Sequence, residues 1–162
     1  MITALELAGF FAAHAIWSVS HGETLIPMLV YTSADGERTM ERLVHDDLEA
    51  AVSYGREKLQ LNGMDAEDAV LLYDGRIPIG REKVDAIILE VRAYFSPGSE
   101  AIIAVPYTPK SSGRFRVHKP KLVAWFKCED FDVNEALRAF FDGVAKHKKG
   151  AKIWSDSLDE SK

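Results

Sequence analysis

Residues 84–95 read VDAIILEVRAYF and carry the clearest strand pattern of the chain. Successive side chains of an extended segment point to opposite faces, so Glu90 and Arg92 share one face. Five apolar side chains share the other face: Ile87, Leu89, Val91, Ala93 and Phe95. A strand with one buried face and one partly polar face is typical of antiparallel sheets, which can leave one side in contact with water.

Apolar stretches on either side of this segment predict further strands, and no helical pattern separates the later ones. Asp-Gly pairs at 35–36 and 74–75 mark turns, and Pro27 places the first strand at an edge or a bulge. Residues 75–80 are interpreted as a connection between strands. The six strands are expected at residues 25–31, 38–44, 69–73, 84–95, 101–107 and 121–127.

Helices are predicted where a capping residue precedes apolar residues spaced three or four apart. The first spans about residues 4–17 and is apolar nearly all round, with Gly9 small enough for another backbone to approach. Such a helix is buried on several sides, either in the core of this chain or between this chain and a second subunit. The second helix begins near Asp46 and stops at Asn62, a residue type that tolerates the left-handed conformation.

The third helix begins after Asp132. Its apolar stripe consists of Val133, Ala136, Leu137, Phe140, Phe141 and Val144. Strands that follow one another without crossover helices favour an antiparallel sheet with the helices on one face. The predicted fold class is α+β, an antiparallel sheet of about six strands with three helices in the order α-β-β-α-β-β-β-β-α.

The chain has 162 residues, of which 47% are hydrophobic and 28% charged, as in ordinary globular domains. We expect a single α+β domain over residues 1–150 and a loose polar C-terminal tail over residues 151–162. Trp154 is isolated in that tail, so it is expected either to dock onto its own domain or to anchor a neighbouring chain.

Localisation is predicted from the N-terminal run and the single cysteine. Residues 7–17 are apolar, but no Lys or Arg precedes them and the run is too short to span a bilayer. Cys128 is the only cysteine, so it cannot form an internal disulfide, and a reducing compartment is the default. The protein is therefore expected to be cytoplasmic and to have no membrane association.

Charge is divided unevenly along the chain. Residues 1–100 hold 8 Lys and Arg against 17 Asp and Glu, whereas residues 101–162 hold 12 against 8. Residues 101–128 contain six bases and no acid. The overall net charge of −5 argues against a dedicated nucleic-acid binder, because such domains are usually basic.

Residues 110–121, the basic segment, are predicted to form a binding site. Its candidate residues are Arg114, Arg116, His118, Lys119 and Lys121. In an extended segment the two arginines and the histidine share one face, while Phe115 and Val117 anchor the other. Guanidinium groups suit carboxylates, so the segment is expected to dock an acidic protein or the acidic part of a second copy. A solubilising loop tip and a site for a small anionic ligand are the alternatives.

The sequence leaves open whether the protein is an enzyme. Side chains that could serve a metal-dependent or hydrolytic site are His14, His21, His45 and Asp85. No His-Glu-x-x-His motif and no Cys/His framework accompanies them. Ser18 and Ser20 lie near His21, but the Gly-x-Ser-x-Gly context of a catalytic serine is missing.

Two carboxylates and the single cysteine are further candidates for catalytic groups. Asp74 and Asp85 flank a predicted connection and could face each other as an acid–base pair, although Asp74 more simply initiates a turn. Cys128 precedes Glu129 and Asp130, whose charges would disfavour a thiolate nucleophile.

The sequence thus predicts a binding or assembly module, most simply a homodimer that uses the first helix or the sheet as its interface. A small hydrolase or metal-dependent enzyme is the alternative. A third interpretation is an apolar ligand pocket under the sheet, lined by Phe95, Tyr107, Trp125 and Phe140. No cofactor and no metal site are assigned.

Overall fold

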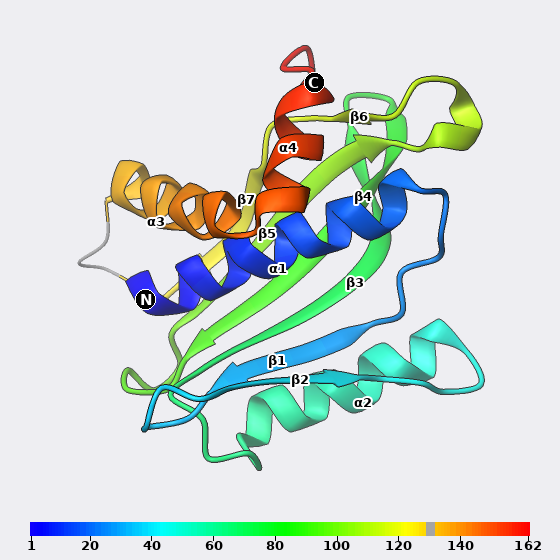
Figure 1. Ribbon diagram of the computed structural model, residues 1–162. Coiled ribbons are helices and arrows are strands. Elements are labelled where there is room, and N and C mark those ends of the chain that lie inside the picture. Colours follow the sequence, from blue (N-terminus) through cyan, green and yellow to red (C-terminus); the bar gives the residue numbers. More distant parts are fainter. Residues whose placement is uncertain (129–131) are drawn as a thin grey trace.

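The computed structural model describes residues 1–128 and 132–162 and has a curled antiparallel sheet with helices on both faces (Figure 1). In the described chain the sheet has seven strands in the order β2-β1-β3-β4-β5-β6, and β7 also pairs with β5. The α+β class and the antiparallel sheet are confirmed. The strands are β1 (Met28–Thr32), β2 (Arg38–Arg42), β3 (Asp68–Ile79), β4 (Glu82–Ala93), β5 (Glu100–Thr108), β6 (Arg116–Val117) and β7 (Lys121–Phe126).

The strand predicted at residues 84–95 is confirmed as most of β4, which lies between β3 and β5 in the sheet. β3 and β4 are each 12 residues long and form one continuous ladder. Residues 75–80, interpreted as a connection, are therefore mostly strand, and the chain reverses at Gly80, where φ is +62°. Because β4 ends at Ala93, Phe95 lies beyond the strand and is 72% exposed rather than buried.

Four α-helices lie in the described chain, one more than predicted. α1, α3 and α4 cover one face of the sheet, whereas α2 packs against the other face (Figure 1). The prediction that the helices share one face is therefore wrong. Their bounds are α1 (Ile2–Ser20), α2 (Leu48–Leu61), α3 (Val133–Lys146) and α4 (Lys148–Asp156).

The composition of β3 explains why α2 occupies the second face. Val70 and Leu72 belong to the core under α1, while Leu71 between them is fully buried on the opposite side. A strand that is apolar on both faces needs cover on both. Ala51 and Leu59 of α2 supply it on the second face.

The sequence does not predict α4, because residues 148–156 (KKGAKIWSD) are mostly polar and the helix is capped by His147. Histidine is not among the preferred N-cap residues. The helix occupies part of the segment expected to be a loose tail. Trp154 on α4 is buried beside Phe140 and Phe141 of α3, with ring centroids 6.1 and 5.7 Å apart. It therefore docks onto its own chain.

α1 is buried in the core of a single chain. Eleven of its residues are buried, and it packs against the sheet, α3 and α4. The backbones of the three helices meet at Gly9, Gly143 and Gly150, where a Cβ would overlap a carbonyl oxygen of the neighbouring helix. The small residues of α1 thus permit close packing within one chain, which was one of the two interpretations of this helix.

α1 is also longer than the predicted helix over residues 4–17. It is long and apolar enough to cross a membrane, but 56% of its apolar stretch is buried inside the protein. A core helix that is apolar on several sides has the same length and composition.

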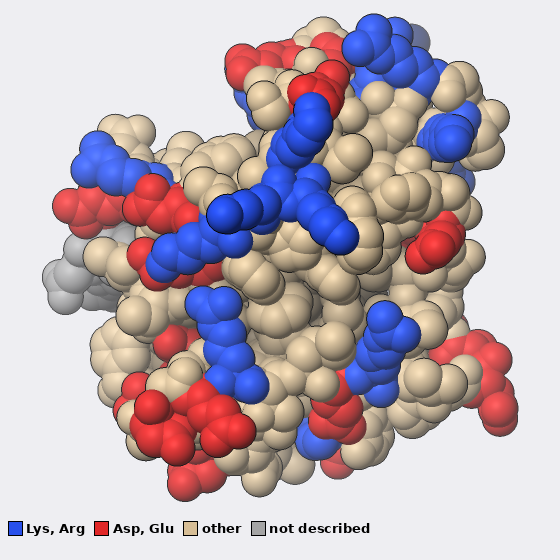
Figure 2. All heavy atoms as spheres, viewed as in Figure 1, with Lys and Arg blue, Asp and Glu red and all other residues tan. Residues whose placement is uncertain are grey.

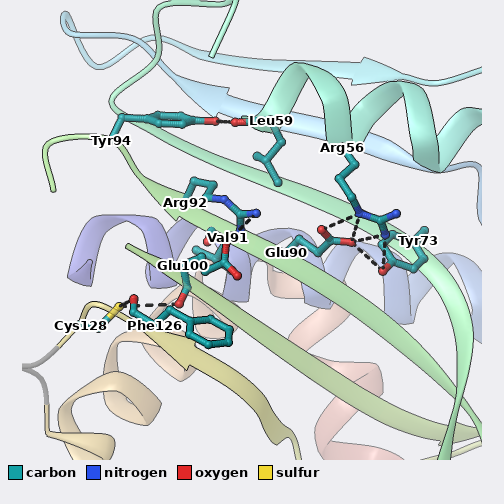
Figure 3. Close-up of polar contacts among 10 residues, drawn as sticks. All are labelled: Arg56, Leu59, Tyr73, Glu90, Val91, Arg92, Tyr94, Glu100, Phe126 and Cys128. Atoms are coloured by element: carbon teal, nitrogen blue, oxygen red, sulfur yellow. Dashed lines mark hydrogen bonds and ion pairs between the residues drawn. The ribbon is translucent and has the colours of Figure 1, made fainter. Parts of the chain in front are cut away.

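A partly buried ion pair fastens α2 to the sheet (Figure 3). Arg56 donates to the Glu90 carboxylate on β4 at 3.0 and 2.6 Å, and the Tyr73 hydroxyl donates to it at 2.7 Å. Burial alone would raise the pKa of Glu90, but the hydrogen bonds from Arg56 and Tyr73 outweigh it and lower that pKa. Burial and the bond to Glu90 raise the pKa of Tyr73 to about 12. At neutral pH the cluster therefore holds a charged Glu90 and a protonated Tyr73.

Candidate functional site

The basic segment, residues 110–121, lies beside the C-terminal residues of the chain. It begins with a 3-10 helix (Lys110–Ser112) and continues into β6. Val117 forms a parallel bridge with Leu158, and its carbonyl accepts a hydrogen bond from the Asp159 N–H at 2.8 Å. The chain's own acidic C-terminal residues therefore border the segment that was predicted to seek an acidic partner.

Two of the predicted binding cations are paired inside the chain. Arg116 lies 3.2 Å from the Asp159 carboxylate, and Lys119 lies 3.9 Å from Glu160. Hydrogen bonds from Ser161, with a smaller contribution from Arg116, lower the pKa of Asp159 to about 2. An external acidic group would have to compete with these contacts.

His118 is only 1% exposed and is not available to a partner at the surface. Its ring nitrogens lie 2.9 Å from the Asp159 carbonyl oxygen and 3.0 Å from the Thr108 hydroxyl. Val117 is fully buried and Phe115 packs against the core, as expected for anchoring residues. The predicted extended conformation, in which alternate side chains share a face, ends with β6 at Val117. His118 therefore does not lie on the exposed face with the arginines, and its ring turns into the core.

Arg114 and Lys110 are exposed, and neither forms an ion pair within residues 1–128 and 132–162. Lys121 begins β7 and lines a small cavity beside α3. Docking of an acidic partner through the basic segment therefore stays a prediction, with Arg114 as an exposed guanidinium that forms no ion pair in the described chain.

His14 on α1 pairs with His147, a residue that the sequence analysis does not select. Nδ1 of His14 is 3.2 Å from Nε2 of His147. His147 also caps α4, because its Nδ1 accepts a hydrogen bond from the Gly150 N–H at 2.9 Å. The rings of Phe10 and Trp17 adjoin the pair, with centroids 5.1 and 6.1 Å from that of His147.

These contacts determine by elimination which nitrogens of the pair carry protons. Nδ1 of His147 accepts, so neutral His147 is protonated on Nε2, which donates to Nδ1 of His14. His14 then carries its own proton on Nε2. A protonated Nε2 has no lone pair for a metal ion, so in this arrangement His147 is a hydrogen-bond partner of His14 and not a ligand.

The pair predicts that stability falls in mild acid. Burial lowers the pKa of His14 and of His147 from the ordinary 6.5, and the charges of His147 and Arg42 lower that of His14 further. Below about pH 6.5 the unfolded chain binds protons that the folded chain does not. Stability is therefore complete above that pH and is lost as pH falls through the lowered pKa values, which urea unfolding at about pH 8, 6.5 and 5 measures.

Two substitutions separate titration from capping. His147→Asn keeps an acceptor for the Gly150 N–H but does not titrate, so it should weaken the pH dependence and change stability little at about pH 8. His147→Ala removes the cap and should cost about 1 kcal/mol at about pH 8. Equal pH dependence in the wild type and His147→Asn would contradict the assignment.

Ser20 and His21 share one helical acceptor, and His45 packs on a different helix. The Ser20 hydroxyl and the His21 ring both hydrogen-bond the Trp17 carbonyl, at 2.6 and 2.8 Å. His45 packs on Tyr54 of α2, with ring centroids 5.0 Å apart. Among the described residues, no group of three or more His, Cys, Asp and Glu side chains could hold a metal ion.

Asp74 and Asp85 do not face each other across the β3–β4 ladder, because Asp74 is registered with Ile87. The Tyr107 hydroxyl donates to both Asp74 oxygens at 2.8 and 2.9 Å, and Asp85 lies 3.7 Å from Arg76. Burial raises the pKa of Asp74, the Tyr107 bond opposes this rise and the charge of Asp85 adds to it. Each carboxylate thus has a separate structural partner.

Cys128 is buried, and burial raises the pKa of its thiol. Its Sγ lies 3.1 Å from the Phe126 carbonyl oxygen (Figure 3). A buried, protonated thiol is a poor nucleophile. Glu129 and Asp130, which are expected to disfavour the thiolate, lie outside the described residues.

An exposed apolar surface runs along α3. Ala136, Phe140 and Val144 of the predicted stripe are buried in the core. Five other large apolar side chains, which we name the α3 surface, are 40–56% exposed: Leu122, Val133, Leu137, Phe141 and Leu158. Contiguous exposed apolar side chains mark interaction sites in soluble proteins.

Two hollows connect the residues of the α3 surface. A groove of about 580 Å³ is lined by Leu137 and Leu158 and by the charged Lys119 and Glu160. A cavity of about 30 Å³ between α3 and β7 shares Pro120 and Leu137 with this groove. The surface is therefore continuous from β7 across α3 to the end of α4.

The predicted apolar ligand pocket under the sheet is almost filled. Trp125 and Phe140 line the 30 Å³ cavity, which has about the volume of one water molecule. Tyr107 is buried in the core, and Phe95 is exposed beyond β4.

The sequence contains the signal for the α3 surface, because a stripe of six apolar residues is wide enough to serve two neighbours. It does not reveal which half of the stripe α1 covers.

No protein-family model, no curated protein and no solved structure matches this chain.

Proposed function

We propose that the protein is a binding and assembly module that forms a homodimer through the α3 surface. The observation that carries the proposal is the exposure of Val133, Leu137 and Phe141 on a helix whose opposite side is already packed in the core. Burial of such side chains against a partner is favourable, because apolar area leaves water.

The spacing of the exposed residues favours a second copy as the partner. Val133, Leu137 and Phe141 follow one another at intervals of four, so the row is symmetric about Leu137. An antiparallel α3 crossing there would set Leu137 against the partner's Leu137 and Val133 against the partner's Phe141. Mutual contact of one patch is the geometry of a two-fold interface, and rows of this spacing interlock in the commonest class of helix packing.

Charges next to the row are compatible with this arrangement. Glu135, Arg138 and Asp142 are exposed on α3, and Lys119 and Glu160 line the groove. Because both signs are present on one patch, a second copy meets complementary charges rather than a uniform field of its own sign.

This interface differs from the predicted ones, which were the first helix or the sheet, and the basic segment of one copy against the acidic first hundred residues of another. An apolar interface should hold or tighten as NaCl is raised, whereas a charge-driven one should weaken. Docking of an acidic surface through the basic segment is the second candidate, and exposed Arg114 supports it. A dimer that dissociates in high salt would favour this charge-driven interface.

Leu137→Glu is expected to dissociate the dimer, because it places two carboxylates at the centre of the interface. A central interface residue is worth about 2 kcal/mol or more, so the dissociation constant should rise at least about thirtyfold. Sedimentation or light scattering over a range of concentrations measures this change. Leu61→Glu on α2 is the matched control, because Leu61 is 74% exposed and lies outside the α3 surface.

At concentrations low enough for the wild type to be monomeric, both variants should unfold near the wild-type temperature, since both side chains are exposed in the monomer. A wild-type protein that stays monomeric at every concentration would contradict the proposed function. A dimer that tolerates Leu137→Glu would assign the interface to another surface.

A further inference from the structure

A third hollow lies beside α1 and is lined by none of the α3-surface residues. It is a cleft of about 90 Å³ between α1, residues 23–28 and β2. Its volume corresponds to about three water molecules. Its polar lining residues are His14, Ser18, Glu23, Thr24 and Arg42.

The lining of the cleft is rich in hydrogen-bond donors. His14 contributes its Nε2–H, because Nδ1 is occupied by His147. Ser18 stands one helical turn after His14 on α1 and contributes a hydroxyl. Arg42, at the end of β2, contributes a guanidinium that forms no ion pair in the described part of the chain.

The charge of Arg42 acts directly on His14. After burial and His147, the guanidinium is the next cause of the lowered pKa of His14. The cleft therefore places a neutral imidazole donor beside a cation that forms no ion pair with a described acid. Figure 2 shows further Lys and Arg side chains gathered on this face where α3 meets α4.

Two other cations, Arg38 of β2 and Lys149 of α4, already contact aromatic rings. The Arg38 guanidinium lies 5.1 Å from the Phe10 ring centroid, and Lys149 Nζ lies 5.4 Å from that of Trp17. Arg42 has no such ring partner among the described residues. Its guanidinium N–H donors also have no hydrogen-bond partner among the described residues.

We propose that the cleft binds the oxyanion group of a small ligand, a carboxylate or a phosphate, through Arg42, His14 and Ser18. Arginine recognises both groups with two parallel N–H donors, and the imidazole and hydroxyl donors complete the contacts. Glu23 lines the same cleft and opposes the anion, so it keeps binding by a bare anion weak. The inference is independent of the proposed dimer, because none of these residues belongs to the α3 surface.

Titration of the full chain with sodium acetate and with inorganic phosphate tests the proposal. The readout is the ring proton signals of His14, assigned by comparison with His14→Gln. We expect a saturable shift with at least one anion, and the anion that saturates at the lower concentration identifies the ligand group. An oxyanion near the ring should also raise the pKa of His14 during the titration.

Arg42→Gln should weaken binding at least about tenfold, because a hydrogen bond to a charged group is lost with the charge. Arg38→Gln removes the same charge from the same strand, but Arg38 does not line the cleft, so binding should change less than about twofold. Glu23→Gln should tighten binding by removing the opposing carboxylate. The proposal is overturned if neither anion gives a saturable shift, if Arg38→Gln weakens binding as much as Arg42→Gln, or if Glu23→Gln weakens it.

Discussion

Gly143→Ala is expected to destabilise the protein by about 3 kcal/mol or more, the upper range for an overpacked core. In an ordinary helix interior the same change stabilises by about 1 kcal/mol, since Ala is the better helix former. Here a Cβ at position 143 would overlap the Glu6 carbonyl oxygen of α1 and lie 2.9 Å from the Phe10 nitrogen. These are backbone atoms and cannot rotate away, so α3 must move off α1.

Urea unfolding of Gly143→Ala beside Gly63→Ala measures this effect. Gly63 follows α2, has no positive φ, and a Cβ there would meet nothing within 4 Å. The control should therefore remain within about 0.5 kcal/mol of the wild type. A Gly143→Ala variant as stable as the control would show that α1 and α3 do not approach as closely as described.

Trp154→Ala is expected to cost about 3–5 kcal/mol, the range for removing a large buried aromatic side chain. Trp154 is 4% exposed and packs against Phe140 and Phe141, so its loss leaves a void between α3 and α4. Because the groove of the α3 surface is lined by Trp154, the void would also reshape the proposed interface.

Trp154→Phe separates packing from polarity. The indole N–H is buried and has no hydrogen-bond partner in residues 1–128 and 132–162, and a buried unpaired donor is destabilising. Phenylalanine keeps an aromatic ring at the site and removes that donor, so its cost should be less than half that of Trp154→Ala. Equal losses of unfolding free energy in the two variants would indicate that the indole N–H donates a hydrogen bond that stabilises the fold.

Periodicity was sufficient to place β4, whose apolar residues alternate with Glu90 and Arg92 over residues 89–93. Capping chemistry was also sufficient at two helix ends: the Asp132 side chain accepts from the Asn134 N–H, and Asn62 adopts the left-handed conformation. It was not sufficient for α1, whose N-cap is Met1 and has no side-chain hydrogen bond. These signals are local, so a single sequence contains all the information they need.

The interactions that could not be predicted join distant parts of the chain. His14 and His147 are 133 positions apart, and no spacing in one sequence pairs them. The N-cap of α4 depends on the same histidine, which is not a usual capping residue. His118 lies in a basic segment by sequence, yet its ring is satisfied by the Thr108 hydroxyl and the Asp159 carbonyl inside the fold. Tertiary contacts decided each of these positions.

The contact between α1 and the last two helices also sets an order of events during synthesis. The partners of the His14–His147 pair are 133 positions apart, which ribosomes take roughly 7–27 s to translate at about 5–20 residues per second. Throughout that interval the apolar α1 segment has left the ribosome without the helices that cover it. Nascent chains of this protein should therefore be chaperone clients until α3 and α4 emerge, and truncations before α3 should aggregate.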